Sequence, residues 1–381
     1  MSRRLVAAAA VTGVGVLALC GLAAIGSTVG ADDLSGPGWV GRVDAVSVSD
    51  KAAMTPDDGS AVALLARSAA AAGSVAYAGR SVSWQRGTTT RTDIVHLPGH
   101  GTLVREAGAP VSTARLMAEG RSGSFADAGR VLALLRVNYR VLREADLDTT
   151  VAGRVADAVL AVDGSGAVAA RYWLDDKTGL LLRRELVDSS GAVWSRTSFI
   201  ALHLGAPSGV TMPVTTAVDA WGEALDSTGL TSARASGCPC PDSLPGGLSL
   251  LETRTAKAGA VAPSPVVHQL FSDGLVTASL FAMPGALGSG DASGLVSRGF
   301  QQVSLGGQSA WTRGGTGAQP AYTVVWSSHG EVLTLVTDDA SDPAATATLV
   351  VDALPPTTVA QPGSFWDRVV RGWHHLVGGG P

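Results

Sequence analysis

Three turn sequences cut the segment 151–204 into apolar runs of similar length, and they constrain the fold more than any other feature of the chain. They are Asp-Gly-Ser-Gly at 163–166, Asp-Asp-Lys-Thr-Gly at 175–179 and Asp-Ser-Ser-Gly at 188–191. Glycine readily adopts the positive φ of a tight turn, and Asp and Ser side chains hydrogen-bond to the backbone of the turn itself. The segment is therefore predicted to form an antiparallel meander of four strands.

Large apolar side chains fall on both faces of this meander. Because side chains alternate along a strand, Tyr172 and Leu174 share one face, and Arg171 and Trp173 share the other. A sheet that is partly apolar on both sides must be covered twice or must hold something on one side. Two interpretations stay open: helices that pack on the sheet, or a curved half-barrel whose concave face receives a lipid or an acylated partner. The candidate ligand-facing residues are Tyr172, Leu174, Trp194 and Ile200.

The flanking segments complete an α+β fold that is mainly antiparallel β. An Ala/Leu-rich run at 61–72, which follows two aspartates, predicts a helix. Residues 75–85 and 90–97 are rich in β-favouring residues and predict strands, and 131–137 predicts a second helix. A first domain, the half-barrel with its covering helices, is thus expected over residues 60–205.

Proline and glycine interrupt the pattern after residue 205, so residues 206–262 are predicted to be an interdomain segment. A smaller α+β domain is expected over 263–356, and the tail at 357–381 contains an amphipathic stretch that could form a docking or interfacial helix. The elements predicted for the small domain are strands at 266–272, 275–281, 299–305, 309–313, 322–327 and 331–337, and a helix at 343–354.

The N-terminal sequence predicts export. Arg3 and Arg4 precede an uncharged apolar stretch that ends at Ala31. Small residues before this point fit cleavage after Ala31, which would make 1–31 a signal peptide and 32–59 a linker. The stretch is also long enough to remain as a membrane anchor. The rest of the chain is expected outside the cytoplasm, soluble or anchored, and close to the membrane.

An extracytoplasmic location bears on Cys238 and Cys240, which form a Cys-Pro-Cys sequence. A metal site would need further ligands, and the only other cysteine of the chain is in the leader. A disulfide between Cys238 and Cys240, pairing with another molecule and a redox role all stay open.

The sequence contains no recognised catalytic motif: nucleophile elbow, Ser-x-x-Lys, His-Glu-x-x-His and P-loop are all missing. The segment 36–41 fits the dinucleotide-binding pattern literally, but it contains proline and follows no predicted strand. With a net charge of −4 and no basic cluster, the chain is also a poor candidate for nucleic-acid binding. We therefore expect no enzyme activity, no cofactor, no metal and no nucleic-acid partner.

Three stretches resemble the MucB/RseB family of sigma-E regulatory proteins. They are Arg-Tyr-Trp-Leu-Asp at 171–175 with Thr-Gly-Leu-Leu-Leu-Arg-Arg-Glu at 178–185, Leu-Pro-Gly-Gly-Leu at 244–248, and Phe-Ser-Asp-Gly-Leu at 271–275 with Ser-Leu-Phe at 279–281. Their order and spacing carry the resemblance. It implies a LolA-like half-barrel followed by a small C-terminal domain.

The resemblance also implies a regulatory function. Such proteins bind the extracytoplasmic part of a membrane-spanning anti-sigma factor, shield it from proteolysis, and release it when a lipid or a misfolded lipoprotein occupies the half-barrel. The residues implied for partner binding are Phe271, Asp273, Gly274 and Leu275. The alternative is an exported lipid or lipoprotein carrier of the LolA or LppX type, which shares the large domain but has no use for the small one.

Overall fold

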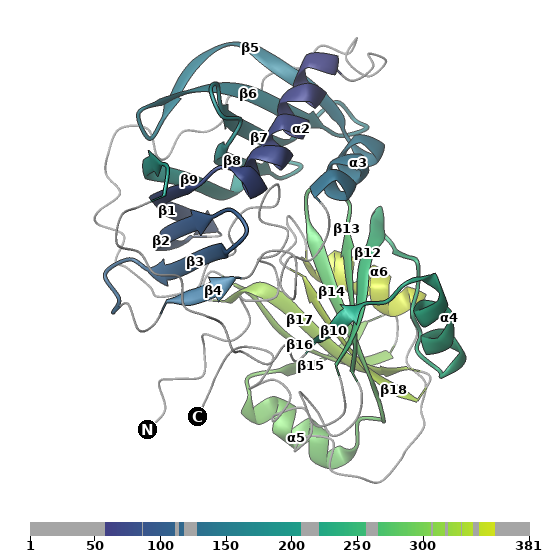
Figure 1. The fold of residues 1–381 in the computed structure, drawn as a ribbon. Helices are drawn as coiled ribbons and strands as arrows, with labels where there is room; N and C mark the ends of the chain where they lie inside the picture. The colour runs from purple at the N-terminus through teal and green to yellow at the C-terminus, as the bar shows by residue number, and fades with distance from the viewer. Residues whose placement is uncertain are drawn as a thin grey trace. The chain divides into compact units, whose positions relative to one another are not determined.

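The computed structural model describes residues 58–354, apart from 86, 111–113, 118–127, 207–220, 257–265, 306–307, 317–318, 329 and 338–342 (Figure 1). The chain divides into two compact units, and the division falls between residues 216 and 217. The predicted signal peptide or anchor, nearly all of the predicted linker and the amphipathic tail lie outside the described residues. No helix within these ranges is both long enough and apolar enough to cross a membrane.

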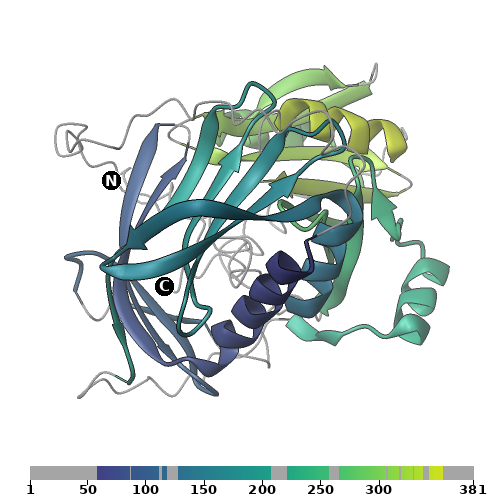
Figure 2. The same ribbon diagram turned by 90° about the horizontal axis from the view of Figure 1, so that it is seen from above.

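The first unit is built on one open, curved antiparallel sheet (Figure 2). Its strand order is β4-β3-β2-β1-β9-β8-β7-β6-β5, so the first and last parts of the unit meet where β1 pairs with β9. The strands are β1 (Tyr77–Gln85), β2 (Thr88–Leu97), β3 (Gly101–Glu106), β4 (Arg115–Met117), β5 (Arg140–Val151), β6 (Arg154–Val162), β7 (Val168–Asp175), β8 (Leu181–Val187) and β9 (Val193–Leu204).

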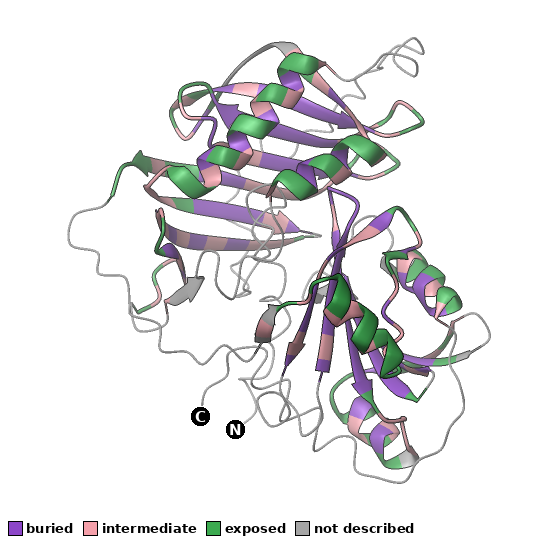
Figure 3. Cartoon of the chain, turned by 45° about the vertical axis from the view of Figure 1, so that its right-hand side comes forward, coloured by how far each residue is buried: buried purple, intermediate pink, exposed green. Residues whose placement is uncertain are grey.

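Two helices pack on this sheet, α2 (Gly59–Ser74) and α3 (Ala128–Asn138). Asp58 caps α2, because its Oδ1 accepts a hydrogen bond of 2.8 Å from the backbone N–H of Ser60. The residues that α2 buries, Ala61, Leu65, Ser68 and Ala71, recur at helical spacing and form one face. Helix α2 contacts α3, β5, β6 and β7, and its exposed side points away from the buried strands (Figure 3).

The predicted meander is confirmed as β6, β7, β8 and β9, with hairpin turns at the three expected places. In the first turn, Asp163 Oδ1 accepts from the N–H groups of Ser165 and Ala167 at 2.8 and 3.0 Å. Asp188 makes the same pair of bonds in the third turn, to Ser190 and Ala192. Local hydrogen bonds that aspartate carboxylates accept from backbone N–H groups therefore build these turns, as the sequence indicated.

The second turn differs, because its first aspartate is buried. The Asp175 carboxylate accepts two hydrogen bonds from Arg154, from Nε at 2.7 Å and from a guanidinium NH2 group at 3.0 Å. It also accepts from the N–H and the hydroxyl of Thr178 at 2.8 and 2.6 Å. Burial alone would raise the pKa of Asp175, but the bonds from Arg154 and Thr178 outweigh burial and hold that pKa below its usual value. This carboxylate ties β6 to the turn between β7 and β8.

The second unit has its own antiparallel sheet, in the order β10-β12-β13-β14-β18-β17-β16-β15, with β11 paired to β12 (Figure 1). Its strands are β10 (Trp221–Ala224), β11 (Ser243–Leu244), β12 (Leu248–Ala256), β13 (Val266–Ser272), β14 (Thr277–Pro284), β15 (Gln301–Leu305), β16 (Gln308–Thr316), β17 (Gln319–Ser328) and β18 (Glu331–Thr337). Its helices are α4 (Ser227–Ala235), α5 (Ser289–Ser297) and α6 (Pro343–Ala353).

The prediction of an interdomain segment at 206–262 is wrong for its described later part. Strands β10, β11 and β12 and helix α4 lie within it, and β12 pairs with β13 along most of its length. The proline and glycine residues that suggested a linker occupy the connections between these elements. The second unit is therefore larger than predicted, and its sheet begins before residue 263.

The core of the second unit lies between this sheet and α6. Trp326 on β17 is fully buried, and its indole N–H donates a hydrogen bond of 2.9 Å to the carbonyl of Leu354, just after α6. Fully buried Val350 and Val351 of α6 belong to the same apolar cluster. This unit therefore has a hydrophobic core of its own.

The Asp175→Asn substitution tests the role of the buried carboxylate. It should cost about 3–5 kcal/mol of unfolding free energy, because it leaves Arg154 without its charge partner. Since the folded-state pKa of Asp175 lies below the unfolded value of 3.8, the stabilisation is complete above that pH and is lost as pH falls through the folded-state pKa. Urea unfolding from pH 7 to pH 2.5 measures both effects. Asp163→Asn, in a turn without an arginine partner, is the control and should cost about 1 kcal/mol or less; equal losses would contradict this account.

Candidate functional site

Backbone pairing places six residues in one row across the first sheet, and we call the face that carries them the inner face. Paired residues of neighbouring antiparallel strands project from the same side of a sheet. Along β2 the inner-face residues Thr90, Thr92, Ile94 and His96 are buried, whereas those between them are half-buried. The row consists of Val159 on β6, Tyr172 on β7, Arg184 on β8, Thr197 on β9, Ser83 on β1 and Thr90 on β2.

One half of the inner face is apolar and lies on β6 and β7. Val159, Ala161, Ala170, Tyr172 and Leu174 are all 0% exposed. Helix α2 contacts both of these strands and buries its own apolar stripe. On this half the sheet is covered by helices, which was the simpler of the two interpretations of the sequence.

The other half of the inner face, on β1, β2 and β9, carries several buried hydroxyl and amide groups beside the apolar Ile94 and Phe199, and we call it the hydroxyl half. Ser81, Ser83, Gln85 and Thr90 are at most 8% exposed. Ser83 Oγ lies 3.1 Å from Thr197 Oγ1, which accounts for one pair of hydroxyls.

Two hydroxyls of this half, Ser81 Oγ and Thr90 Oγ1, are buried without a hydrogen-bond partner. A buried polar group left unpaired costs about 1–3 kcal/mol. Such groups are usually satisfied by ordered water or by a ligand. The hydroxyl half is therefore the part of the inner face where a polar group of a ligand fits best, and we take the inner face as the candidate functional site.

The four predicted ligand-facing residues are not brought together. Tyr172 and Leu174 lie side by side on the inner face, fully buried. Trp194 is the extra residue where β9 shifts register against β8, and Ile200 is the extra residue where it shifts against β1. Ile200 is 43% exposed. A β-bulge breaks the alternation of side chains, so strand pairing assigns neither residue to the inner face, and their ligand-facing role stays a prediction.

The hydroxyl half was not predicted, although the sequence held a signal for it. Ser81, Ser83 and Gln85 alternate with Val82 and Trp84, and Thr88–Thr90 opens the next strand. Alternation of this kind marks one polar and one apolar face. The polar face would ordinarily be assigned to solvent, so its burial could not be read from the sequence.

Of the four residues implied for partner binding, Phe271 lies near the end of β13, and Asp273, Gly274 and Leu275 form the turn between β13 and β14. Asp273 Oδ1 accepts from the N–H groups of Leu275 and Val276 at 2.7 and 2.8 Å. Gly274 adopts a φ of 101°, which favours glycine. Phe271, Asp273 and Leu275 are 0%, 6% and 4% exposed. The visible role of these residues is to close the hairpin, and their role in partner binding stays a prediction.

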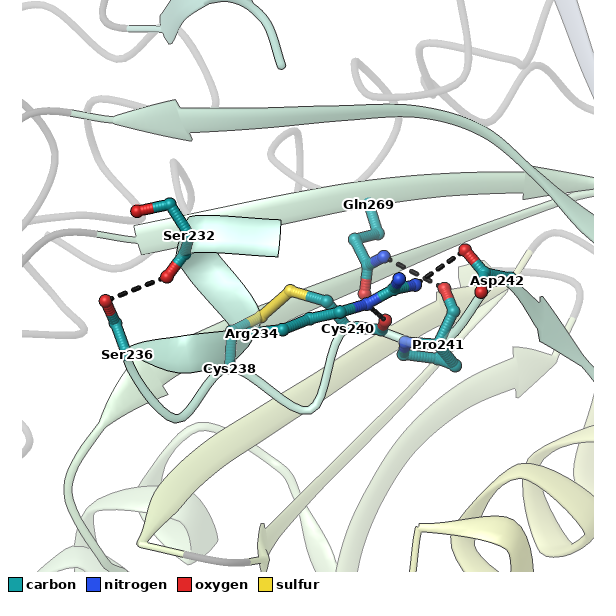
Figure 4. The surroundings of a disulfide bond; sticks show 8 residues. All are labelled: Ser232, Arg234, Ser236, Cys238, Cys240, Pro241, Asp242 and Gln269. Carbon is teal, nitrogen blue, oxygen red and sulfur yellow. Dashed lines mark hydrogen bonds and ion pairs between the residues drawn. A yellow bond between two sulfur atoms is a disulfide. The ribbon is translucent and has the colours of Figure 1, made fainter. Parts of the chain in front are cut away.

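Cys238 and Cys240 are joined by a disulfide between α4 and β11 (Figure 4). Arg234, in the last turn of α4, donates from Nε to the carbonyl of Cys240 at 2.8 Å and contacts the Asp242 carboxylate at 2.6 Å. Cys238 packs against the main core of the second unit. Because α4 buries none of its residues, the Cys-Pro-Cys loop is a main attachment of this helix.

Two buried titratable groups in the second unit have strongly shifted pKa values. Burial lowers the pKa of His268, which stacks on Phe281 at a centroid distance of 4.4 Å, to about 3. Burial raises the pKa of Glu331 to about 7. Burial is the leading cause of both shifts, so neither calls for a catalytic role. The described part of the chain contains no group of three or more His, Cys, Asp or Glu residues that could hold a metal ion.

Thr90→Val tests whether the hydroxyl half is built for a ligand. The variant should be as stable as the wild type or up to about 1 kcal/mol more stable, because it removes a buried hydroxyl that has no protein partner. Thr197→Val is the control and should cost about 1 kcal/mol, since it breaks the contact with Ser83. Urea unfolding of the chain without added ligand measures both. Equal destabilisation would show that Thr90 serves the fold.

A second substitution tests the disulfide. Replacing Cys238 and Cys240 by serine should cost only about 1–2 kcal/mol, because the disulfide closes a very short loop. Hydrogen exchange should accelerate at the amides of α4 and remain unchanged in β13 and β14. Faster exchange throughout the second unit would instead make the disulfide essential to the whole sheet.

Residues 111–220 match the family model of the MucB/RseB N-terminal domain. This range includes α3 and the strands β5 to β9, and therefore the whole meander. No curated protein matches the chain.

Solved structures of MucB are similar to the chain at 20% identity. A crystal structure of MucB aligns with 78% of this chain and 98% of its own, with a TM-score of 0.49. The complex of Pseudomonas aeruginosa MucA and MucB aligns with 76% and 98%, with a TM-score of 0.46. A structure of MucB with MucA(peri) aligns with 76% and 97%, with a TM-score of 0.44.

The match of residues 111–220 covers the whole meander, which is the part of the chain that carries the first stretch of the sequence resemblance. The resemblance found in the sequence is thereby confirmed, because residues 111–220 of this chain match the model of the MucB/RseB N-terminal domain.

Proposed function

We propose that this chain is an extracytoplasmic regulator that binds the extracytoplasmic segment of a membrane anti-sigma factor and controls its proteolysis. The match of residues 111–220 to the MucB/RseB N-terminal domain carries this proposal. In two of the structures named above, MucB is bound to MucA or MucA(peri). We transfer that kind of partner to this chain because of the family-model match.

The inner face supports a role for a ligand in this regulation. Its apolar half is covered by α2, and its hydroxyl half contains the unpaired groups of Ser81 and Thr90. An amphiphile such as a lipid or a lipoprotein acyl anchor offers both an apolar and a polar part. A ligand bound there would shift the equilibrium of the complex only by the difference between its affinities for the bound and the free form.

Export is part of the same proposal. The leader at 1–31 would direct the chain across the membrane, where it acts as a soluble protein or stays anchored. The Cys238–Cys240 disulfide is consistent with an oxidising compartment.

A binding experiment tests the proposed function. The chain without residues 1–31 is titrated with the purified extracytoplasmic segment of each single-span anti-sigma factor from the same organism. We expect saturable one-to-one binding to one of them and slower cleavage of that segment by its protease. The cytoplasmic domain of the same anti-sigma factor is the control and should not bind.

The result also separates the regulator from a carrier. A carrier would bind none of the segments and would transfer extractable lipid between vesicles. For a regulator, lipid should weaken the complex by about fivefold or more. A complex that is unchanged by lipid would leave partner binding intact and contradict the regulatory role of the inner face.

A further inference from the structure

The face of the first sheet opposite to the inner face carries a compact group of charged and aromatic residues, which we call the arginine cluster. It consists of Arg171 and Trp173 on β7, Arg183 and Glu185 on β8, and Arg196 on β9. Glu185 pairs with Arg171 on one side and with Arg196 on the other, and Arg183 pairs with Trp173. Side chains from three neighbouring strands therefore meet on one side of the sheet.

The Glu185 carboxylate forms ion pairs with all three arginines of the cluster. Glu185 Oε1 lies 2.6 Å from Arg196 Nε and contacts Arg183, and its Oε2 lies 4.0 Å from a guanidinium nitrogen of Arg171. The Glu185 side chain is 2% exposed, and those of Arg171 and Arg196 are 9% and 12% exposed. The cluster thus carries two more positive than negative charges in a chain whose net charge is −4.

Among the residues that the structure describes, neither position paired with the two ends of the cluster is acidic. Leu160 on β6 lies opposite Arg171, and Trp84 on β1 lies opposite Arg196. The next acidic residue in the same rows is Glu144 on β5, which is separated from Trp173 by Ala158. Burial lowers the pKa of Arg196 although Glu185 acts in the opposite direction, so the guanidinium is poorly solvated where it stands.

Two hydrogen-bond donors of the cluster are also unused. Arg171 Nε and Trp173 Nε1 have no hydrogen-bond partner, although these residues are only 8% and 5% exposed. The Arg183 guanidinium lies 4.4 Å from the centre of the Trp173 ring, which holds it beside these donors. Buried donors without acceptors and an excess of buried positive over negative charge are both costly to a folded protein. An oxyanion would correct both.

We propose that the arginine cluster is a binding site for a phosphate group. A phosphate monoester carries close to two negative charges at neutral pH and several strong acceptor oxygens, which match the excess charge and the free donors. Guanidinium groups are suited to phosphate because their parallel N–H groups bind two oxygens at once. The phosphate belongs to a soluble compound or to a lipid headgroup, and the chemistry of the site is the same for both. The site does not depend on the proposed anti-sigma partner.

Titration with inorganic phosphate tests this site in the full exported chain, with sodium chloride at matched ionic strength as the reference. Calorimetry should show saturable binding, and thermal unfolding should shift upward with phosphate. Arg171→Gln should weaken binding about tenfold or more. Glu185→Gln keeps every guanidinium and adds net positive charge, so it should bind phosphate more tightly than the wild type. A purely structural ion-pair cluster would show no phosphate effect in either variant.

Two further variants complete the test, one as a control for specificity and one in case Glu185→Gln fails to fold. Arg105→Gln removes one arginine from the Arg80–Asp93–Arg105 ion pairs on β1 to β3 and should leave phosphate binding unchanged. If Glu185→Gln does not fold alone, the Arg171→Gln/Glu185→Gln double variant keeps the excess charge of the wild type but lacks the Arg171 donors, and it should bind phosphate more weakly than the wild type. The absence of saturable phosphate binding in the wild type, or equal loss in Arg105→Gln and Arg171→Gln, overturns the proposal.

Vesicles identify the source of the phosphate. Phosphatidic acid vesicles should bind the wild type but not Arg171→Gln if the site takes a lipid headgroup, and phosphatidylcholine vesicles should bind neither. Phosphate binding without vesicle binding assigns the site to a soluble phosphorylated compound. Vesicle binding that persists in Arg171→Gln, together with no binding of inorganic phosphate, contradicts the site.

Discussion

The buried carboxylate of Asp175 fixes the register of the central strands, and both faces of the first sheet depend on that register. Because the side-chain period of a strand is two, a shift by one residue would exchange Tyr172 with Trp173 between the faces. The carboxylate prevents this by binding Arg154 on β6 and Thr178 in the following turn together. Helix α2 meets the same turn, where Arg67 donates to the carbonyl of Asp176 at 3.0 Å.

Gly179 makes that meeting possible. Its φ is 80°, and a Cβ placed on it would lie 2.8 Å from Cγ of Arg67, so a larger residue would strain the turn and displace the helix. The turn therefore sets both the pairing of the strands and the position of α2. The division of the inner face into a covered apolar half and a hydroxyl half follows from where α2 lies.

How much the sequence could predict depended on whether the signal was local. The turns of the meander were predictable because Asp, Ser and Gly build them from their own hydrogen bonds, and the bounds of β13 and β18 followed from apolar runs between turn residues. The two β-bulges in β9, at Trp194 and Ile200, leave no comparable signal in the sequence. Helix α5 is rich in glycine and serine, and it is held by the carboxylate of Asp291 on Gly288 N–H and by burial of Leu295. Tertiary contacts of this kind override weak propensity.

The candidate site shows the same limit more sharply. Sequence parity gave the correct faces for Arg171, Tyr172, Trp173 and Leu174, because β7 has no irregularity in that stretch on the β6 side. Sequence parity could not show that the polar face of β1 and β2 is buried, or that Glu185 forms ion pairs with three arginines. Both facts arise from neighbours that are distant in sequence, and both concern polar groups whose cost appears only after burial.

A half-barrel of this kind does not by itself determine a function, because one fold can support carriage or regulation. The two classes differ in what they require beyond the sheet. A carrier needs a face that holds its cargo, and the inner face alone would meet that need. The second unit has its own sheet and its own core around Trp326, and it includes β12, which the sequence had left outside. A carrier has no evident use for an independently cored unit, whereas a regulator needs a surface for a partner in addition to a site for a ligand, and this difference favours regulation.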